Sequence, residues 1–161
     1  METKIYVGTY AKYNDGSIAG EWLTLSDYAD KDEFLEACAK LHEDEHDPEF
    51  MFQAFEGETF GRTSEDHVDA DLFEVLRELD TDQAEIYAAY RKNFDGSWWE
   101  CQDRYQGEFK SDKDFAQEYA ESCGDIDRQV SWPHSHIDWE AAAAELMQGY
   151  IEENGHYFSA H

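Results

Sequence analysis

The chain has 161 residues and a net charge of −27, from 39 Asp and Glu against 12 Lys and Arg. Its 10 Phe, 10 Tyr and 5 Trp are too many large apolar side chains for an intrinsically disordered chain. The charge is spread evenly, with 15 acidic and 4 basic residues in 1–60, 12 and 4 in 61–103, and 12 and 4 in 104–161. Such a coat repels nucleic acid and anionic membranes and attracts basic protein surfaces.

The cysteines and the hydropathy pattern indicate a cytoplasmic protein. Cys38, Cys101 and Cys123 contain no CxxC pair, and an odd number leaves one thiol over in any disulfide scheme. No apolar run approaches the length of a membrane span, and the N-terminal residues lack the apolar stretch of a signal peptide.

The first third predicts a small α+β unit. Lys4–Tyr10 and Ile18–Leu25 are typical of strands, and the Asn-Asp-Gly sequence at 14–16 favours a hairpin turn between them. Asp30–Leu41 predicts a helix with an aspartate cap, and Glu49–Glu56 alternates as a third strand does.

The middle third predicts two helices, Asp71–Leu79 and Thr81–Asn93, with a break in the axis at Asp80 and Thr81. Their apolar residues recur at helical spacing and would face a core. Four carboxylates at i, i+4, i+8 and i+11 would face solvent: Glu74, Glu78, Asp82 and Glu85.

The last third predicts a strand at Tyr105–Phe109, a helix over Ser111–Asp127, a turn at Trp132-Pro133, a helix over Asp138–Ile151 and an edge strand at His156–Ala160. In the helix over Ser111–Asp127, the serine is the expected N-cap and Gly124 the expected end. One face of this helix is apolar, with Phe115, Ala116, Tyr119, Ala120 and Cys123; the other carries Asp114, Glu118, Glu121 and Asp125 at i, i+4, i+7 and i+11.

These elements predict an α+β fold built from three small modules: residues 1–60, a helical module over 61–103, and residues 104–161. No Gly/Ser-rich or Pro-rich linker separates the modules, so we expect them to be joined stiffly.

The motifs associated with metal sites have simpler interpretations. His42–His46 matches HExxH, but Pro48 ends any helix and the stretch is too charged to bury, so an acidic loop is expected. Asp66–Glu74 alternates acids as a calcium loop does but lacks its central glycine and final glutamate. His134 and His136 lie near tryptophans, where packed imidazoles are expected. With no nucleophile motif or phosphate loop, we predict no enzyme activity, no cofactor and no metal.

Four stretches resemble the antirestriction protein ArdA family. They are KIYVGTYAKYNDGSIAGEWL (4–23), DKDEFLEACAKLHEDEHDPEFMFQAFEG (30–57), RYQGEFKSDKDFAQEYAESCG (104–124) and SWPHSHIDWEAAAAELMQGYIEENGHYF (131–158). The resemblance covers nearly the whole chain and is most specific in its first and last thirds.

The resemblance implies a DNA mimic carried on mobile genetic elements. Such proteins occupy the DNA-binding groove in the methyltransferase core of type I restriction-modification enzymes and block DNA binding. It also implies an elongated homodimer of three-module protomers, and no binding of nucleic acid or membrane by the chain itself. Duplex DNA carries one charge per about 1.7 Å of axis, so 27 charges correspond to about 46 Å. A compact chain of this length has a radius of gyration of about 15 Å, so matching that density requires an elongated shape.

The family's antirestriction motif falls on the helix over Ser111–Asp127. Cys123 stands where the family pattern leads us to expect an aliphatic residue. The predicted partner-binding residues, which would mimic phosphates, are Asp112, Asp114, Glu118, Glu121, Asp125 and Asp127, together with Glu74, Glu78, Asp82 and Glu85.

The residues alone leave other functions open. A generic acidic binding protein, such as a chaperone for basic DNA-binding proteins, would bind many basic proteins alike. A halophile's housekeeping domain would unfold at low salt. A metalloprotease at His42–His46 would require metal.

Overall fold

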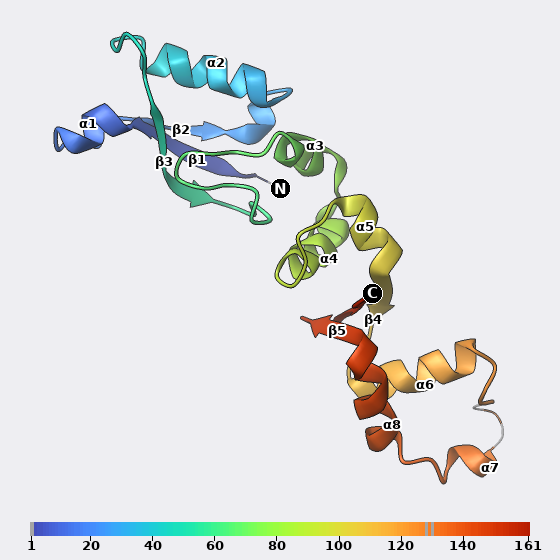
Figure 1. Ribbon diagram of the computed structural model, residues 1–161. Coiled ribbons are helices and arrows are strands. Elements are labelled where there is room, and N and C mark those ends of the chain that lie inside the picture. Colours follow the sequence, from blue (N-terminus) through green and yellow to red (C-terminus); the bar gives the residue numbers. More distant parts are fainter. Residues whose placement is uncertain (1, 128, 130) are drawn as a thin grey trace. The chain divides into compact units, whose positions relative to one another are not determined.

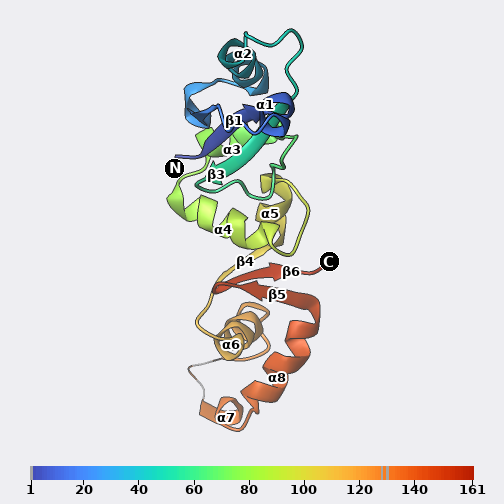
Figure 2. The same ribbon diagram turned by 90° about the vertical axis from the view of Figure 1, so that its left-hand side faces the viewer.

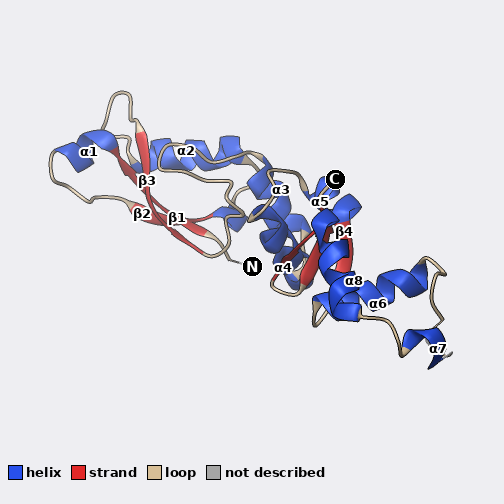
Figure 3. Cartoon of the chain, turned by 60° about the horizontal axis from the view of Figure 1, so that its bottom comes forward, coloured by secondary structure: helices blue, strands red, loops and turns tan. Residues whose placement is uncertain are grey.

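The computed structural model describes residues 2–127, 129 and 131–161 of the chain. The chain divides into two compact units, Met1–Ala88 and Ala89–His161, and each is described by itself. Each unit contains helices and one three-stranded antiparallel sheet, so the predicted α+β class is confirmed (Figures 1 and 3). The boundary between the units lies within one helix, and the division into three modules stays a prediction.

The first unit contains a sheet in the order β2-β1-β3. Its strands are β1 (Lys4–Thr9), β2 (Glu21–Thr24) and β3 (Phe50–Glu56), close to the three predicted. β1 and β2 pair antiparallel as the predicted hairpin, and the predicted turn is present at Gly16, which has a φ of 79°. The short helix α1 (Tyr10–Asn14), which was not predicted, precedes this turn in the connection.

Helix α2 (Lys31–Leu41) covers one face of this sheet, following the 3₁₀ turn η1 (Leu25–Asp27) (Figure 1). The Asp30 side chain accepts a hydrogen bond from the Glu33 amide at 3.0 Å, which confirms the predicted cap. Phe34 is fully buried, and its ring lies 5.9 Å from that of Phe52 and 5.6 Å from that of Phe73. These contacts join the helix to the sheet and to the next helix.

Helices α3 (Asp71–Glu78) and α4 (Thr81–Arg91) confirm the predicted pair and the break between them. Leu79 is extended, with φ −83° and ψ 130°. The Asp80 carboxylate then accepts from the Gln83 amide at 2.9 Å while the Gln83 side chain accepts from the Asp80 amide at 3.1 Å. This reciprocal cap starts α4 as a separate helix.

The second unit contains a sheet in the order β4-β6-β5, with β4 (Tyr105–Glu108), β5 (Tyr150–Glu153) and β6 (His156–Ser159). Two predictions are wrong here. β6 is the central strand rather than an edge strand, since it pairs with both neighbours. The helix predicted to reach Ile151 instead ends at Leu146, and β5 follows it.

Around α6 (Asp112–Ser122), the second unit contains α5 (Trp98–Arg104), which was not predicted, α7 (Ser131–His134), α8 (Trp139–Leu146) and the 3₁₀ turn η2 (Met147–Gly149). α6 lies beside α8 (Figure 2), where Ala116 packs against Trp139 and Ala143. On the sheet side, the Phe115 ring lies 4.7 Å from that of Tyr157.

α6 ends at Ser122, and the following turn around Gly124 stops it before Asp125. Gly124 has a φ of 77°, its amide donates to the Glu121 carbonyl at 3.0 Å, and the Asp125 amide donates to the Ala120 carbonyl at 3.1 Å. This pair of bonds around a left-handed glycine is a Schellman motif, which stops the helix. Gly124 therefore ends α6 as predicted, and Cys123 is exposed rather than part of the apolar face.

Candidate functional site

The predicted carboxylates of α6 lie at the surface, but the first of them also supports the fold. Asp112 is exposed, and its Oδ1 accepts a hydrogen bond from the Tyr157 hydroxyl at 2.7 Å. Tyr157 is only 2% exposed. Its burial and its bond to Asp112 raise the pKa of the Tyr157 phenol. Asp112 therefore provides the acceptor for a buried hydroxyl.

Asp114 takes part in the cap of the same helix. The Ser111 hydroxyl accepts from the Asp114 amide at 3.1 Å and donates to the Asp114 carboxylate at 3.0 Å. The carboxylate is exposed in the first turn, where it also interacts favourably with the helix dipole.

The remaining α6 carboxylates do not form a single row. Glu118 is exposed and Glu121 half-buried, both on the helix, whereas Asp125 and Asp127 follow the Schellman motif. The expected continuation of the row to Asp125 on the helix is therefore wrong. The turn at Gly124 breaks the helical spacing.

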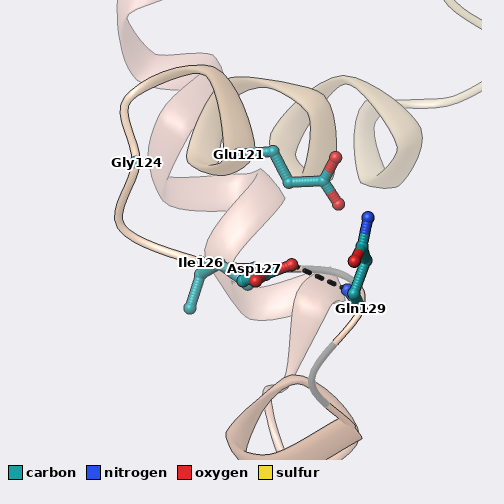
Figure 4. Close-up of a pocket in the computed structure, with 5 residues that line it drawn as sticks. All are labelled: Glu121, Gly124, Ile126, Asp127 and Gln129. Carbon is teal, nitrogen blue, oxygen red and sulfur yellow. Dashed lines mark hydrogen bonds between the residues drawn. The ribbon is translucent and has the colours of Figure 1, made fainter.

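A hollow of about 690 Å³ brings Glu121 and Asp127 together, and Gly124, Ile126 and Gln129 also line it (Figure 4). The Glu121 carboxylate points toward the side chain of Gln129, and the Asp127 carboxylate accepts from the Gln129 amide at 2.9 Å. The end of α6 thus presents two carboxylates around one concave surface.

The second predicted set lies in the first unit. Glu74 and Glu78 are exposed on α3, and Asp82 and Glu85 are exposed on α4. Within residues 2–127, 129 and 131–161, these four side chains and Asp125 make no ion pair or hydrogen bond. Their charges are available to a partner.

Several cations of the chain are already paired with other carboxylates. Lys12 lies 2.8 Å from Asp44 and 3.7 Å from Glu45, and Arg62 lies 3.5 Å from Asp69. Lys4, Arg91 and Lys92 form further pairs with Glu2, Asp95 and Glu153. These pairs neutralise carboxylates outside the two predicted sets. The carboxylates of the predicted sets keep their negative charge.

The HExxH stretch begins with a structural histidine. α2 ends at Leu41, so His42 and His46 do not share a helix face. His42 is 1% exposed, its Nε2 lies 3.0 Å from the Val7 carbonyl oxygen, and its Nδ1 lies 2.9 Å from the Lys12 ammonium. The expectation of a wholly solvated loop is therefore wrong at this residue.

The other candidate ligands also have structural contacts. The His134 ring lies 5.1 Å from that of Trp139, and His136 Nδ1 lies 3.0 Å from the Ser135 hydroxyl. Among the described residues, no group of three or more His, Cys, Asp or Glu side chains is arranged to hold a metal ion.

The buried thiols are protected from ionisation. Burial raises the pKa of both Cys38 and Cys101 to about 12. A thiol is nucleophilic as its thiolate, so these two cysteines are structural.

No helix in the described parts of the chain combines the length and apolar character needed to cross a membrane.

Fold and surface together define a class: an acidic α+β protein whose candidate site is a set of carboxylates, most of them exposed. The family model of the antirestriction protein (ArdA) matches residues 5–158, and the chain belongs to this family. A comparison with curated proteins gives no match. Family membership implies an antirestriction function, exerted by an inhibitor of restriction enzymes.

Proposed function

We propose that this protein is a DNA mimic that occupies the DNA-binding groove of type I restriction-modification enzymes and blocks DNA binding. Its partner is the methyltransferase core of such an enzyme. The chain acts in the cytoplasm as an elongated homodimer encoded on a mobile genetic element. It performs no catalysis and binds neither nucleic acid nor membrane itself.

The observation that carries this proposal is the excess of carboxylates in both units. Residues 1–88 contain 24 acids against 6 bases, and residues 89–161 contain 15 against 6. A surface of one sign attracts a groove of the opposite sign and speeds association at low ionic strength. The exposed carboxylates that have no partner among the described residues, such as Glu74 and Glu85, are the groups that a basic groove can bind.

Spacing along the helices supports the comparison with phosphates. Glu74 and Glu78 are one helical turn apart, a rise of about 6 Å. Two phosphate steps along one DNA strand advance about 6.8 Å. Asp114 and Glu118 repeat this spacing on α6. Each of these two carboxylate pairs is therefore spaced to bind two cations that normally bind alternate phosphates of one DNA strand.

The second candidate is a generic acidic binding protein or chaperone for basic DNA-binding proteins. The same excess of carboxylates would support it. A chaperone binds unrelated basic proteins with similar affinity, whereas a mimic discriminates in favour of enzymes with a DNA groove.

Competition with DNA tests the proposal directly. A type I enzyme is bound to labelled duplex DNA, and the protein is added at increasing concentration while fluorescence anisotropy is measured. We expect the DNA to be displaced, and excess DNA to reverse the displacement. The affinity should fall as salt is raised, because the Debye length shrinks to about 3 Å at 1 M. A ternary complex that retains DNA would contradict the mimic.

The variant that tests the carboxylates carries Glu74→Gln, Glu78→Gln, Asp82→Asn and Glu85→Gln. Exposed ion pairs contribute about 0.2–1 kcal/mol each, so four lost together correspond to roughly 1–4 kcal/mol of binding. We expect inhibition to weaken by about fivefold or more while the thermal unfolding temperature changes little.

The control neutralises four exposed carboxylates outside the predicted sets: Asp15→Asn, Asp27→Asn, Glu140→Gln and Glu145→Gln. Both variants carry the same net charge. Equal weakening by both would show that only total charge matters, which favours the chaperone.

A further inference from the structure

An apolar hollow lies in the first unit between α4 and the loop that follows β3. Its volume is about 310 Å³, and it is lined by Thr81, Ala84 and Ala88 of α4 together with Glu58 and Glu85. The two alanines are one helical turn apart and share a face. Because their side chains are single methyl groups, the face between the two glutamates is open.

The position of Glu58 is set by the turn before it. Gly57 has a φ of 84°, and a Cβ there would lie 2.4 Å from the Glu2 carbonyl oxygen, so only glycine fits. The Thr3 hydroxyl donates to the Glu58 carbonyl at 2.8 Å, and the Glu58 carboxylate accepts from the Phe60 amide at 2.8 Å through Oε1. The backbone of Glu58 is thereby held, and its other carboxylate oxygen takes no part in that bond.

α4 is fixed against the same loop. The Phe60 ring, 2% exposed, lies 5.1 Å from the fully buried Tyr87 ring, and the Tyr87 hydroxyl accepts from Arg62 at 2.9 Å. Ala84, on the preceding turn, is 3% exposed. The backbone of α4 beside the hollow is thus held by the packed core before any partner binds.

The chemistry of the lining selects the occupant. The floor is formed by alanine methyl groups, which suit an aliphatic stem, and the ionisable groups among the described lining residues, Glu58 and Glu85, are both carboxylates. Glu85 forms no ion pair within the described residues. Arginine combines an apolar stem with a planar cation that donates to two carboxylates at once, whereas lysine offers a compact point charge.

We propose that this hollow receives one arginine side chain from the groove of the restriction enzyme, with the guanidinium between Glu58 and Glu85 and the stem against Ala84 and Ala88. This inference rests on the proposed function. The arginine contact would depend on the shape of the hollow, whereas the other contacts with the enzyme would depend on charge alone.

The test fills the hollow without changing any charge. Ala88→Leu places a larger apolar side chain over the floor, and Ala39→Leu, at an exposed position of α2, is the matched control. With a type I enzyme in the displacement assay, we expect Ala88→Leu to lose about thirtyfold in affinity, the smallest loss that defines an interface hot spot, and Ala39→Leu to be unchanged. Thermal unfolding of each variant checks the fold.

A double-mutant cycle links the hollow to its carboxylate. Glu85→Gln alone should weaken binding, but in the Ala88→Leu background it should weaken binding by less than about twofold, because the arginine is already excluded. If the two substitutions reduce the affinity independently, so that their fold-losses multiply, the proposal is overturned. Glu85 would then act only as one of the many negative charges on the surface.

A second measurement tests the hollow without the enzyme. N-acetylarginine amide is titrated into the wild-type protein while the methyl signals of Ala84 and Ala88 are followed by NMR, with N-acetyllysine amide as the comparison. We expect saturable shifts with the arginine compound and weaker ones with the lysine compound. No shift, or equal shifts with both, would overturn the arginine assignment.

The outcomes separate this inference from the proposed function. If the wild-type protein displaces DNA but Ala88→Leu matches Ala39→Leu, the hollow has no role and the mimic stands. If the wild-type protein displaces no DNA, the proposed function fails, and the NMR titration alone decides whether the hollow binds arginine.

Discussion

Removing the acceptor of the buried Tyr157 hydroxyl should destabilise the second unit. Asp112→Ala leaves that hydroxyl, 2.7 Å from the carboxylate in the native structure, without its partner. A buried polar group left unsatisfied costs about 1–3 kcal/mol. Loss of a carboxylate from the first turn of α6 costs about 0.3–1 kcal/mol more. We therefore expect the free energy of unfolding to fall by about 1–4 kcal/mol.

The same change should cost far less in a Tyr157→Phe background. Phenylalanine keeps the ring contacts with Phe115 at 4.7 Å and Phe109 at 5.4 Å but has no hydroxyl to satisfy. Only the helix-end contribution of about 0.3–1 kcal/mol is then lost with Asp112. The coupling between the two positions should be about 1–3 kcal/mol.

Urea unfolding of the four proteins in the cycle, followed by tryptophan fluorescence, measures this coupling. Asp125→Ala is the control, because this exposed carboxylate has no partner in the described part of the chain and its loss should change stability by less than about 0.5 kcal/mol. Additive effects of Asp112→Ala and Tyr157→Phe would refute the reasoning, since the hydrogen bond would then contribute nothing to stability.

Three further predictions concern stability. Ser97→Ala removes the hydroxyl that accepts from the Glu100 amide at the start of α5, and it should lower the free energy of unfolding, measured with urea, by about 0.5–2 kcal/mol. Gly57→Ala should lower the thermal unfolding temperature, because its left-handed backbone alone costs about 1–2 kcal/mol and its Cβ would overlap the Glu2 carbonyl. The raised pKa of Tyr157 means that the folded state holds this proton more tightly than the unfolded state, whose pKa is near 10.0. Its contribution to stability is complete below pH 10.0 and is lost as the pH rises through the folded value, so urea unfolding at pH 9 and 11 should show a decline that Tyr157→Phe reduces.

Local signals in the sequence were sufficient to predict the caps of α2 and α6. Asp30 and Ser111 each cap the helix that they were predicted to begin, and Gly124 ends α6. A cap depends on residues three or four positions apart, so its chemistry is complete within the segment. The exposure of the predicted carboxylates follows for the same reason, since the apolar residues of α3 and α6 define the opposite face.

Two of the elements that were missed, β5 and α5, have a signal in the sequence. Asn154-Gly155 has φ values of 53° and 85° at the tip of the β5–β6 hairpin, and this dipeptide favours such a turn. Ser97 and Glu100 form the capping box that begins α5. β5 was predicted as part of a helix because residues 138–151 have helical periodicity and Tyr150 fits the pattern of a helix as well as that of a strand.

The sequence by itself determined the α+β class, the charged coat and the caps of α2 and α6, because composition and spacing of a few residues govern them. Only the tertiary structure decided which groups meet across long separations. It joined Asp112 to Tyr157, buried His42 against Val7, and brought Glu58 to the hollow beside Glu85. These contacts depend on how the elements pack, and packing is a property of the whole core that no local pattern encodes.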